Sequence, residues 1–311
     1  MQLEVWMWVA FGVFVVGMLI VDLVAFGNRG EEIPLRRAVA WSIGWTVLGV
    51  AFGGFLWLWQ GRVPAGEYFA GFLIEKSLSV DNLFVFALIF AYFAVPAAFQ
   101  RRVIFWGIVG AIVLRGLFIL AGAALLEAFH YTIYVFGIFL VVTGIRMARH
   151  SGVEIHPERN PVLKLLRRVV PLTDHYREDR LVVRENGKRY ATPMVAALVL
   201  VATFDVVFAV DSIPAIFAVT RDTFIVYAAN AFSLLGLAAL YFVLAGMMGK
   251  FRYLNVGLAA ILIFVGAKMT LSDVFHVPVW LSLVVIVTLL GGAIGASLLR
   301  ARREEPATVV P

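Results

Sequence analysis

Nine long apolar stretches constrain the fold of this chain more than any other feature. A helix that crosses a lipid bilayer needs roughly 20 predominantly apolar residues. Stretches of about this length lie at 5–26, 38–59, 67–93, 103–126, 131–148, 193–218, 224–247, 254–272 and 279–299. Charged residues make up only 15% of the chain, whereas soluble domains average about 25%. We therefore predict an all-α, polytopic membrane protein with nine transmembrane helices in one domain, residues 1–311.

The Lys and Arg residues between these stretches predict how the chain is oriented. Alternate loops, starting with the one after the first span, hold 21 Lys and Arg residues, and the loops on the opposite side hold 2. Cytoplasmic loops carry the excess of positive charge in membrane proteins. We therefore expect an external N-terminus and a cytoplasmic C-terminus in the inner (plasma) membrane. The same bias explains the net charge of +6, so this charge does not indicate a nucleic-acid partner.

The longest loop, 149–192, falls on the cytoplasmic side in this scheme. Its segment PVLKLLRRVVPL (161–172) mixes apolar and basic residues and suits the anionic surface of the inner leaflet. The segment LVVRENGKRYAT (181–192) predicts a β-hairpin, because Asn186-Gly187 suits a type I′ turn. The loop is either a solvated connector or a docking site for cytoplasmic or membrane protein partners.

Three pairs of similar motifs indicate an internal repeat. The pairs, in the same order along the chain, are EKSLSVDN (75–82) with DVVFAVDS (205–212), LFILAG (117–122) with YFVLAG (241–246), and VVTGIRM (141–147) with IFVGAKM (263–269). They divide the chain into repeats of three spans each, at about 67–148 and 193–272, which would cross the membrane in opposite directions. Inverted repeats of this kind are common in transporters, whose binding sites lie near the midplane between the halves.

Four carboxylates lie inside the third and sixth spans: Glu75, Asp81, Asp205 and Asp211. Each intramembrane acid costs about 2.5–3.5 kcal/mol on insertion scales, so the four together cost on the order of 10 kcal/mol. Something must offset this cost. One possibility is a bound cation, and the other is that the acids only pair with the intramembrane bases to hold the helices together.

Helical spacing predicts which polar groups share a face. Residues at i, i+4 and i+7 lie on one side of a helix, so Glu75, Ser79 and Asn82 form one face. Asp205 and Ser212 occupy the matching positions in the second motif. The small residue between the acid and the polar residue would let the two helices approach closely.

The second acid of each motif can join the same site as the first acid only if the helices are not straight. Asp81 and Asp211 lie six residues after the first acids, which is about 9 Å along an unbroken helix and well round its circumference. One compact site for all four acids therefore requires bent or broken helices. Pro214 predicts such a break in the sixth span, where it would free the carbonyl of Val210 as a further oxygen ligand.

The donor set predicts the chemistry of the site. Carboxylates, amides, hydroxyls and carbonyls suit Mn²⁺, Ca²⁺ or Mg²⁺, and the chain has no cysteine. Without a cation, four close carboxylates would take up protons as a coupled group, so proton exchange is our hypothesis for coupling. The predicted metal ligands are Glu75, Asp81, Asn82, Asp205, Asp211 and Ser212. The secondary candidates are Ser79, Val210, Asn230 and Asp22, and the expected charge partners are Lys76, Arg115 and Lys268.

These motifs resemble those of the TerC (tellurium-resistance C) family, and in particular its Alx members. The likeness rests on EKSLSVDNLFVF (75–86), DVVFAVDSIPAIFAVT (205–220), NPVLKLLRRVVPLTD (160–174) and VRENGKRYATP (183–193). It implies nine spans, kinship with the LysE transporter superfamily, Mn²⁺ export and tellurite resistance, with the motif acids at the four positions named above. This chain departs from the family at Ala202 and Ala238, where a Glu and an Arg are common.

We therefore expect a secondary transporter that exports divalent cations, with Mn²⁺ as its substrate and no prosthetic group. Two other functions compete with this expectation. An intramembrane aspartyl protease would also use two aspartates, but the chain has no Gly-x-Gly-Asp motif and its acids form two equivalent pairs, so we do not expect an enzyme. A membrane scaffold for a metal or tellurite stress-response complex would use loop 149–192 to dock its partners.

Overall fold

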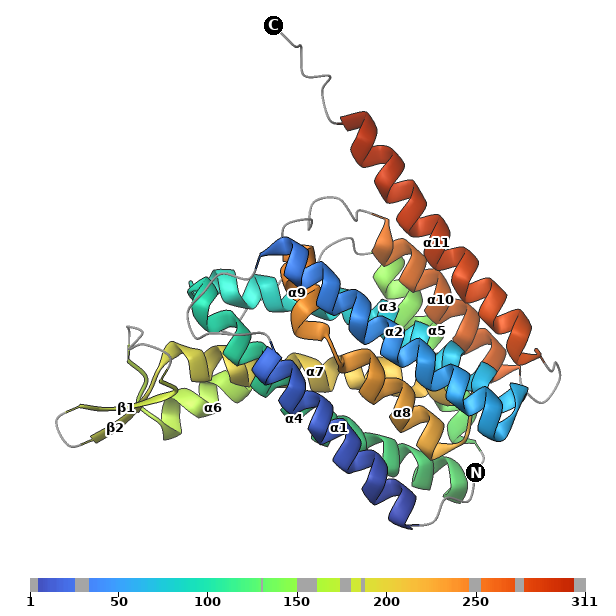
Figure 1. The fold of residues 1–311 in the computed structure, drawn as a ribbon, viewed down its shortest axis with the longest axis horizontal. Helices are drawn as coiled ribbons and strands as arrows, with labels where there is room; N and C mark the ends of the chain where they lie inside the picture. Colours follow the sequence, from blue (N-terminus) through green and yellow to red (C-terminus); the bar gives the residue numbers. More distant parts are fainter. Residues whose placement is uncertain are drawn as a thin grey trace, which may run out of the picture.

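Helices form almost all of the fold in the computed structural model of the chain (Figure 1). The structure describes residues 5–25, 34–129, 131–149, 161–173, 180–185, 188–245, 253–271 and 277–304. The helices are α1 (Val5–Ala25), α2 (Leu35–Gln60), α3 (Arg62–Tyr92), α4 (Ala97–Ala128), α5 (Thr132–Arg149), α6 (Pro161–Val169), α7 (Pro193–Phe217), α8 (Thr223–Leu234), α9 (Leu237–Ala245), α10 (Leu254–Thr270) and α11 (Val279–Glu304). Two short strands, β1 (Val182–Glu185) and β2 (Lys188–Ala191), complete the described elements.

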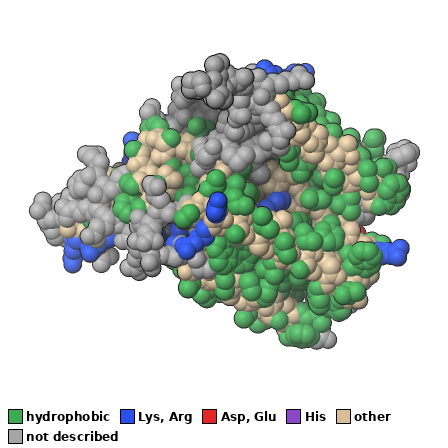
Figure 2. Space-filling view, turned by 45° about the horizontal axis from the view of Figure 1, so that its top comes forward, with side chains coloured by type: hydrophobic (Ala, Val, Ile, Leu, Met, Phe, Trp, Pro, Cys, Tyr) green, Lys and Arg blue, Asp and Glu red, His purple; other side chains and the backbone are tan. Residues whose placement is uncertain are grey.

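The long apolar helices confirm an integral, multi-pass membrane protein. Six described helices are long and apolar enough to cross a bilayer, and α8 with α9 passes the same test as one pair bent by 45°. Large hydrophobic side chains remain exposed along these helices, such as Leu58 at 90% and Trp280 at 66%. Figure 2 shows hydrophobic side chains over most of the described surface on one face, with Lys and Arg at only a few places. A surface of this kind needs lipid around it.

Helix α3 and helix α10 lie at the two remaining predicted spans. Helix α3 has 31 residues but carries charged side chains, and α10 has 17 residues. Neither meets the same criterion of length and apolarity within the described residues. The number nine therefore stays a prediction, although the element bounds follow the predicted spans closely along the chain.

The predicted break in the sixth span is wrong. Helix α7 continues through Pro214 to Phe217, and α3 is continuous from Arg62 to Tyr92. Pro214 stands close to the end of α7, where the lost hydrogen bond disturbs only the last turn. The break occurs instead in the predicted seventh span, at Leu235 and Gly236 between α8 and α9, where Gly236 has φ +76°. Glycine adopts this conformation without steric cost.

Helices α3, α4, α7 and α8 pack together at the centre of the molecule. Helix α3 contacts both α7 and α8, and α4 contacts the same two helices from another side. Helices α5 and α10 form the most extensive pair, and α2 and α11 cover α3 (Figure 1). Glu75 of α3 and Asp205 of α7 are therefore buried in the interior of the helical bundle.

The loop between α5 and α7 contains folded elements. Strands β1 and β2 pair antiparallel, with Val182 opposite Ala191. This pairing confirms the predicted hairpin, whereas the turn at 186–187 lies outside the described residues. Helix α6 packs against α7, and its Leu163 is buried there while Lys164 and Leu165 are exposed. No contact in the described structure tests a docking role for this loop.

Candidate functional site: a buried ion-pair centre

Arg115 of α4 forms the middle of the buried polar centre. Its guanidinium pairs with Glu75 of α3 through Nη1, and its Nη2 donates to Oδ1 of Asp205 of α7 at 2.8 Å. The Nε group lies 3.2 Å and 3.3 Å from the two oxygens of Asp205. Arg115 is 1% exposed, Glu75 0% and Asp205 3%. One guanidinium thus joins the two carboxylates that the sequence places in the two repeats.

Two amides extend the centre on either side of the guanidinium. The Asn230 Oδ1 atom of α8 lies 3.5 Å from Arg115 Nη1. Asn82 of α3 is best oriented with Oδ1 accepting from Arg115 Nη2 at 3.3 Å and its amide nitrogen donating to the Leu78 carbonyl at 3.0 Å. Four helices, α3, α4, α7 and α8, therefore contribute side chains to one buried network.

Several polar atoms near these residues lack hydrogen-bond partners. Within the described part of the chain, Glu75 Oε2, Ser79 Oγ, Ser212 Oγ and Asn230 Nδ2 are buried and make no hydrogen bond. A buried polar atom without a partner costs about 1–3 kcal/mol, and two of these four atoms belong to residues that contact Arg115, namely Glu75 and Asn230. Carboxylate and hydroxyl oxygens of this kind are the donors that a hard cation prefers.

Small residues allow the helices that carry the centre to approach closely. A Cβ atom on Gly107 of α4 would lie 2.8 Å from Val201 Cγ1 of α7. A Cβ atom on Gly71 of α3 would lie 3.0 Å from Ile216 Cγ2 and 3.2 Å from Ala229 Cβ. Close approach of backbones at small residues is the usual packing of membrane helices. It places the first acids of both motifs within reach of a single arginine.

The second acids of the motifs do not join this centre in the same way. The Asp211 side chain faces Thr143 of α5 instead of Arg115. This follows from an unbroken α7, which turns residues six apart to different sides. The side chain of Asp81 lies outside the described residues. Among the described side chains, no three acidic or histidine groups gather closely enough to hold one metal ion.

The remaining predicted residues have other partners. Lys76 Nζ donates to the Ser233 carbonyl at 3.2 Å, and Lys268 Nζ donates to Ser282 Oγ at 3.0 Å. Of the three expected charge partners, Arg115 is the one that bonds carboxylates of the centre. The secondary candidate Asp22 lies away from the centre and accepts a hydrogen bond of 2.8 Å from Trp45 Nε1. Val210 is 43% exposed, and the role of its carbonyl oxygen as a ligand stays a prediction.

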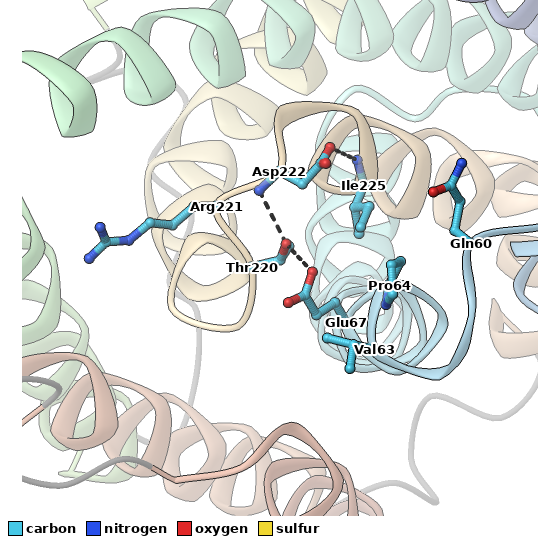
Figure 3. Close-up of a pocket in the computed structure, with 8 residues that line it drawn as sticks. All are labelled: Gln60, Val63, Pro64, Glu67, Thr220, Arg221, Asp222 and Ile225. Atoms are coloured by element: carbon cyan, nitrogen blue, oxygen red, sulfur yellow. Dashed lines mark hydrogen bonds between the residues drawn. The ribbon is translucent and has the colours of Figure 1, made fainter. Parts of the chain in front are cut away.

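A separate cavity of about 370 Å³ opens where α3 begins and where α7 leads into α8. Figure 3 shows Glu67 and Thr220 pointing toward each other there, with Asp222 beside them. Thr220 Oγ1 donates to Glu67 Oε2 at 2.6 Å, and Asp222 Oδ1 accepts from the backbone nitrogens of Phe224 and Ile225. Glu67 precedes Glu75 by eight residues, or about 12 Å along α3. Thr220 and Thr143 were not predicted from the sequence, because a lone hydroxyl in an apolar segment gives no signal of its partner.

The centre brings two acids and one base from three helices into contact. Two acidic side chains share one guanidinium in the bundle interior, so the acids outnumber the base that bonds them. Buried ion pairs are costly, and replacing them with apolar residues is often neutral or stabilising. Intramembrane ionisable residues of this kind commonly mark ion or substrate pathways.

Comparison with known proteins identifies the family of this chain. A family model described as the integral membrane protein TerC family matches residues 60–305. The uncharacterized membrane protein STKORF319 of Myxococcus xanthus is 46% identical over 95% of this chain and 93% of its own length. The proposed membrane-bound redox modulator Alx of Escherichia coli strain K12 is 45% identical over 90% of each chain. No solved structure matches the chain. This protein therefore belongs to the TerC family of integral membrane proteins.

Proposed function

We propose that this protein is a secondary transporter that exports divalent cations, with Mn²⁺ as its substrate, in exchange for protons. The observation that carries the proposal is the pair Glu75 and Asp205, which two separate helices bring together in the bundle interior. Their carboxylates, with the unpartnered hydroxyls of Ser79 and Ser212, supply oxygen donors for a hard cation. Ca²⁺ and Mg²⁺ prefer the same donors and are the competitors to test.

We also propose that α3–α5 and α7–α10 are inverted repeats and that α3 and α10 complete nine spans. The contact between α5 and α10 supports this arrangement. A Cβ atom on Gly137 would lie 2.8 Å from the Gly266 carbonyl oxygen, and one on Gly144 would lie 2.8 Å from the Ala259 carbonyl oxygen. The motif alignment pairs Gly144 with Gly266 and Gly137 with Ala259. A two-fold rotation that exchanges the repeats would therefore map the contact between Gly137 and Gly266 onto the contact between Gly144 and Ala259.

The cavity beside Glu67 suits the external mouth of the pathway in this proposal. The charge bias of the loops predicts that the start of α3 lies on the outer side, and the acidic Glu67 and Asp222 line the cavity together with the basic Arg221. Between it and Glu75, the close packing of Gly71 against Ile216 and Ala229 provides a barrier that must open during export.

Flux through the purified protein tests the proposal. The full chain is reconstituted in proteoliposomes that contain a Mn²⁺-sensitive dye, and a parallel set contains a pH dye. We expect Mn²⁺ movement with opposite proton movement in wild type, and its loss in Glu75→Gln and Asp205→Asn. Glu127→Gln, which removes an exposed carboxylate near the end of α4, is the matched control. Equal flux in all four proteins would refute the proposed site, and Mn²⁺ flux without proton movement would refute the exchange.

A scaffold role is the second candidate, because α6 and the β-hairpin are folded instead of forming an extended connector. Exposed Leu165 at 61% and Val169 at 71% offer apolar contacts there. Deleting 181–192 should leave Mn²⁺ flux intact if this segment only docks partners. The Alx relatives are named for redox modulation, but this chain has no cysteine, so any redox effect would not use thiols of its own.

A further inference from the structure

Arg115 occupies the position between Glu75 and Asp205 that a transported cation would need. We infer that its guanidinium is a tethered cation, which competes with the divalent substrate for these two carboxylates and thereby sets the selectivity of the site. This inference rests on the proposed function and adds a role for a residue that is not itself a metal ligand. Its basis is the geometry of the centre, in which one side chain bonds both acids.

The guanidinium and a divalent cation cannot share the two carboxylates. Arg115 uses Nη1 for Glu75 and both Nε and Nη2 for Asp205. A divalent cation bound to the same oxygens would lie within a few ångströms of this positive charge, and repulsion between like charges is strong in the dry interior of a membrane protein. Binding of the substrate therefore requires Arg115 to withdraw from at least one acid.

The centre contains other hydrogen-bond acceptors for the Arg115 guanidinium when it leaves a carboxylate. The amide oxygens of Asn82 and Asn230 lie 3.3 Å and 3.5 Å from its terminal nitrogens. These acceptors are neutral, so they can hold the guanidinium while the two carboxylates bind the metal. A short side-chain movement exchanges carboxylate partners for amide partners and keeps the guanidinium hydrogen-bonded.

Polar atoms that lack hydrogen-bond partners favour the replacement of Arg115 by a divalent cation at the carboxylates. Ser79 Oγ, Ser212 Oγ and Glu75 Oε2 make no hydrogen bond within the described residues. The two hydroxyls lie on the helix faces of Glu75 and Asp205, and a divalent cation can use their oxygen lone pairs as well as the carboxylates. Substrate binding would thus satisfy groups that the arginine leaves unsatisfied.

This competition discriminates by charge. A monovalent cation that displaces Arg115 replaces one positive charge by another, whereas a divalent cation brings one more positive charge to a centre in which two acids share one guanidinium. The arginine therefore weakens the binding of every cation to the two carboxylates, and it weakens the binding of monovalent ions most. Between transport cycles, the guanidinium also offsets the negative charge of the two carboxylates.

Equilibrium binding of radioactive Mn²⁺ to the full chain in nanodiscs tests the inference. An opposite charge beside a carboxylate disfavours another cation there by about 10- to 1000-fold, judged from its effect on proton binding. We therefore expect Arg115→Gln to bind Mn²⁺ at least about tenfold more tightly than wild type and to lose discrimination against Na⁺. Lys268→Gln removes an intramembrane base that bonds a serine hydroxyl and is the control, with an expected change of less than about twofold.

A second variant decides the outcome if Arg115→Gln does not fold. Arg115→Lys keeps the charge but cannot bond both carboxylates with a planar fork, so it should bind Mn²⁺ more tightly than wild type and less tightly than Arg115→Gln. Affinity equal to or weaker than wild type in the folded Arg115 variants would overturn the inference. Absence of Mn²⁺ binding in wild type would instead overturn the proposed function, so the two failures are distinguishable.

Discussion

The contact between α5 and α10 gives the sharpest prediction about the fold. Gly266 lies against the backbone of α5, and a Cβ atom at this position would stand 2.6 Å from the Gly137 carbonyl oxygen and 2.8 Å from the Val141 nitrogen. Ordinary contact begins near 3.4 Å, so Gly266→Ala requires α5 and α10 to move apart by about 0.8 Å at this point. Because both nearest atoms belong to the backbone, no side-chain rotation relieves the overlap.

The expected cost follows from overpacking. Forcing an extra carbon into a packed interface typically costs about 1–3 kcal/mol. Gly110→Ala in α4 is the matched control, since a Cβ atom there would meet nothing within 4 Å. In a helix interior, replacing Gly by Ala at an open position stabilises by roughly 0.5–1 kcal/mol. The two substitutions make the same chemical change and should therefore act in opposite directions.

Equilibrium unfolding of the purified protein in detergent, by urea or SDS titration, measures both variants against wild type. We expect a lower free energy of unfolding for Gly266→Ala and an equal or higher value for Gly110→Ala. If Gly266→Ala were as stable as Gly110→Ala, the close backbone approach of α5 and α10 would be refuted. The support that this approach gives to the inverted repeat would then be lost as well.

Two further predictions concern single hydrogen bonds. Tyr68 is fully buried and its hydroxyl donates to the Gly49 carbonyl at 2.9 Å, so Tyr68→Phe should lower the free energy of unfolding by about 1–2 kcal/mol; a change below about 0.3 kcal/mol in a urea titration would contradict this. Asp222 caps the N-terminus of α8 through Oδ1, so Asp222→Ala should cost about 1 kcal/mol in the same titration, whereas Asp222→Asn, which keeps the acceptor, should cost much less. Equal losses in Asp222→Ala and Asp222→Asn would argue against the cap.

The long apolar helices were predictable because a bilayer requires a similar length and apolarity of every helix that crosses it. Every apolar stretch predicted from hydropathy contains a helix, and the bounds differ by between zero and six residues, from α1 (5–26 predicted, 5–25 observed) to the start of α4 (103 predicted, 97 observed). The break was not predictable from local rules. Pro214 is tolerated near the end of α7. The actual break has a positive φ at Gly236, where a Cβ atom would also overlap the Trp45 side chain, and only the packed bundle reveals this contact.

The site was predictable in its residues more than in its arrangement. Helical spacing placed Glu75 with Asn82, and Asp205 with Ser212, on single faces, but it could not say which base they would meet. Arg115 lies on a different helix, and its contact with both acids depends on how α4 packs against α3 and α7. The prediction that Lys76 and Lys268 share its role of charge partner had no geometric basis, because sequence alone does not give the partners of a long flexible side chain.

The position of bound Mn²⁺ tests the central claim most directly. Crystals of the full chain grown with Mn²⁺ would be measured at the manganese absorption edge, where anomalous scattering locates the ion. We expect a peak between α3 and α7, with oxygens of Glu75 and Asp205 about 2.0–2.6 Å away, as for hard divalent cations, and with Arg115 turned toward Asn82 or Asn230. A peak only at other residues, or an ion-free centre in which Arg115 still bonds both acids at saturating Mn²⁺, would contradict the claim that these carboxylates bind the transported cation.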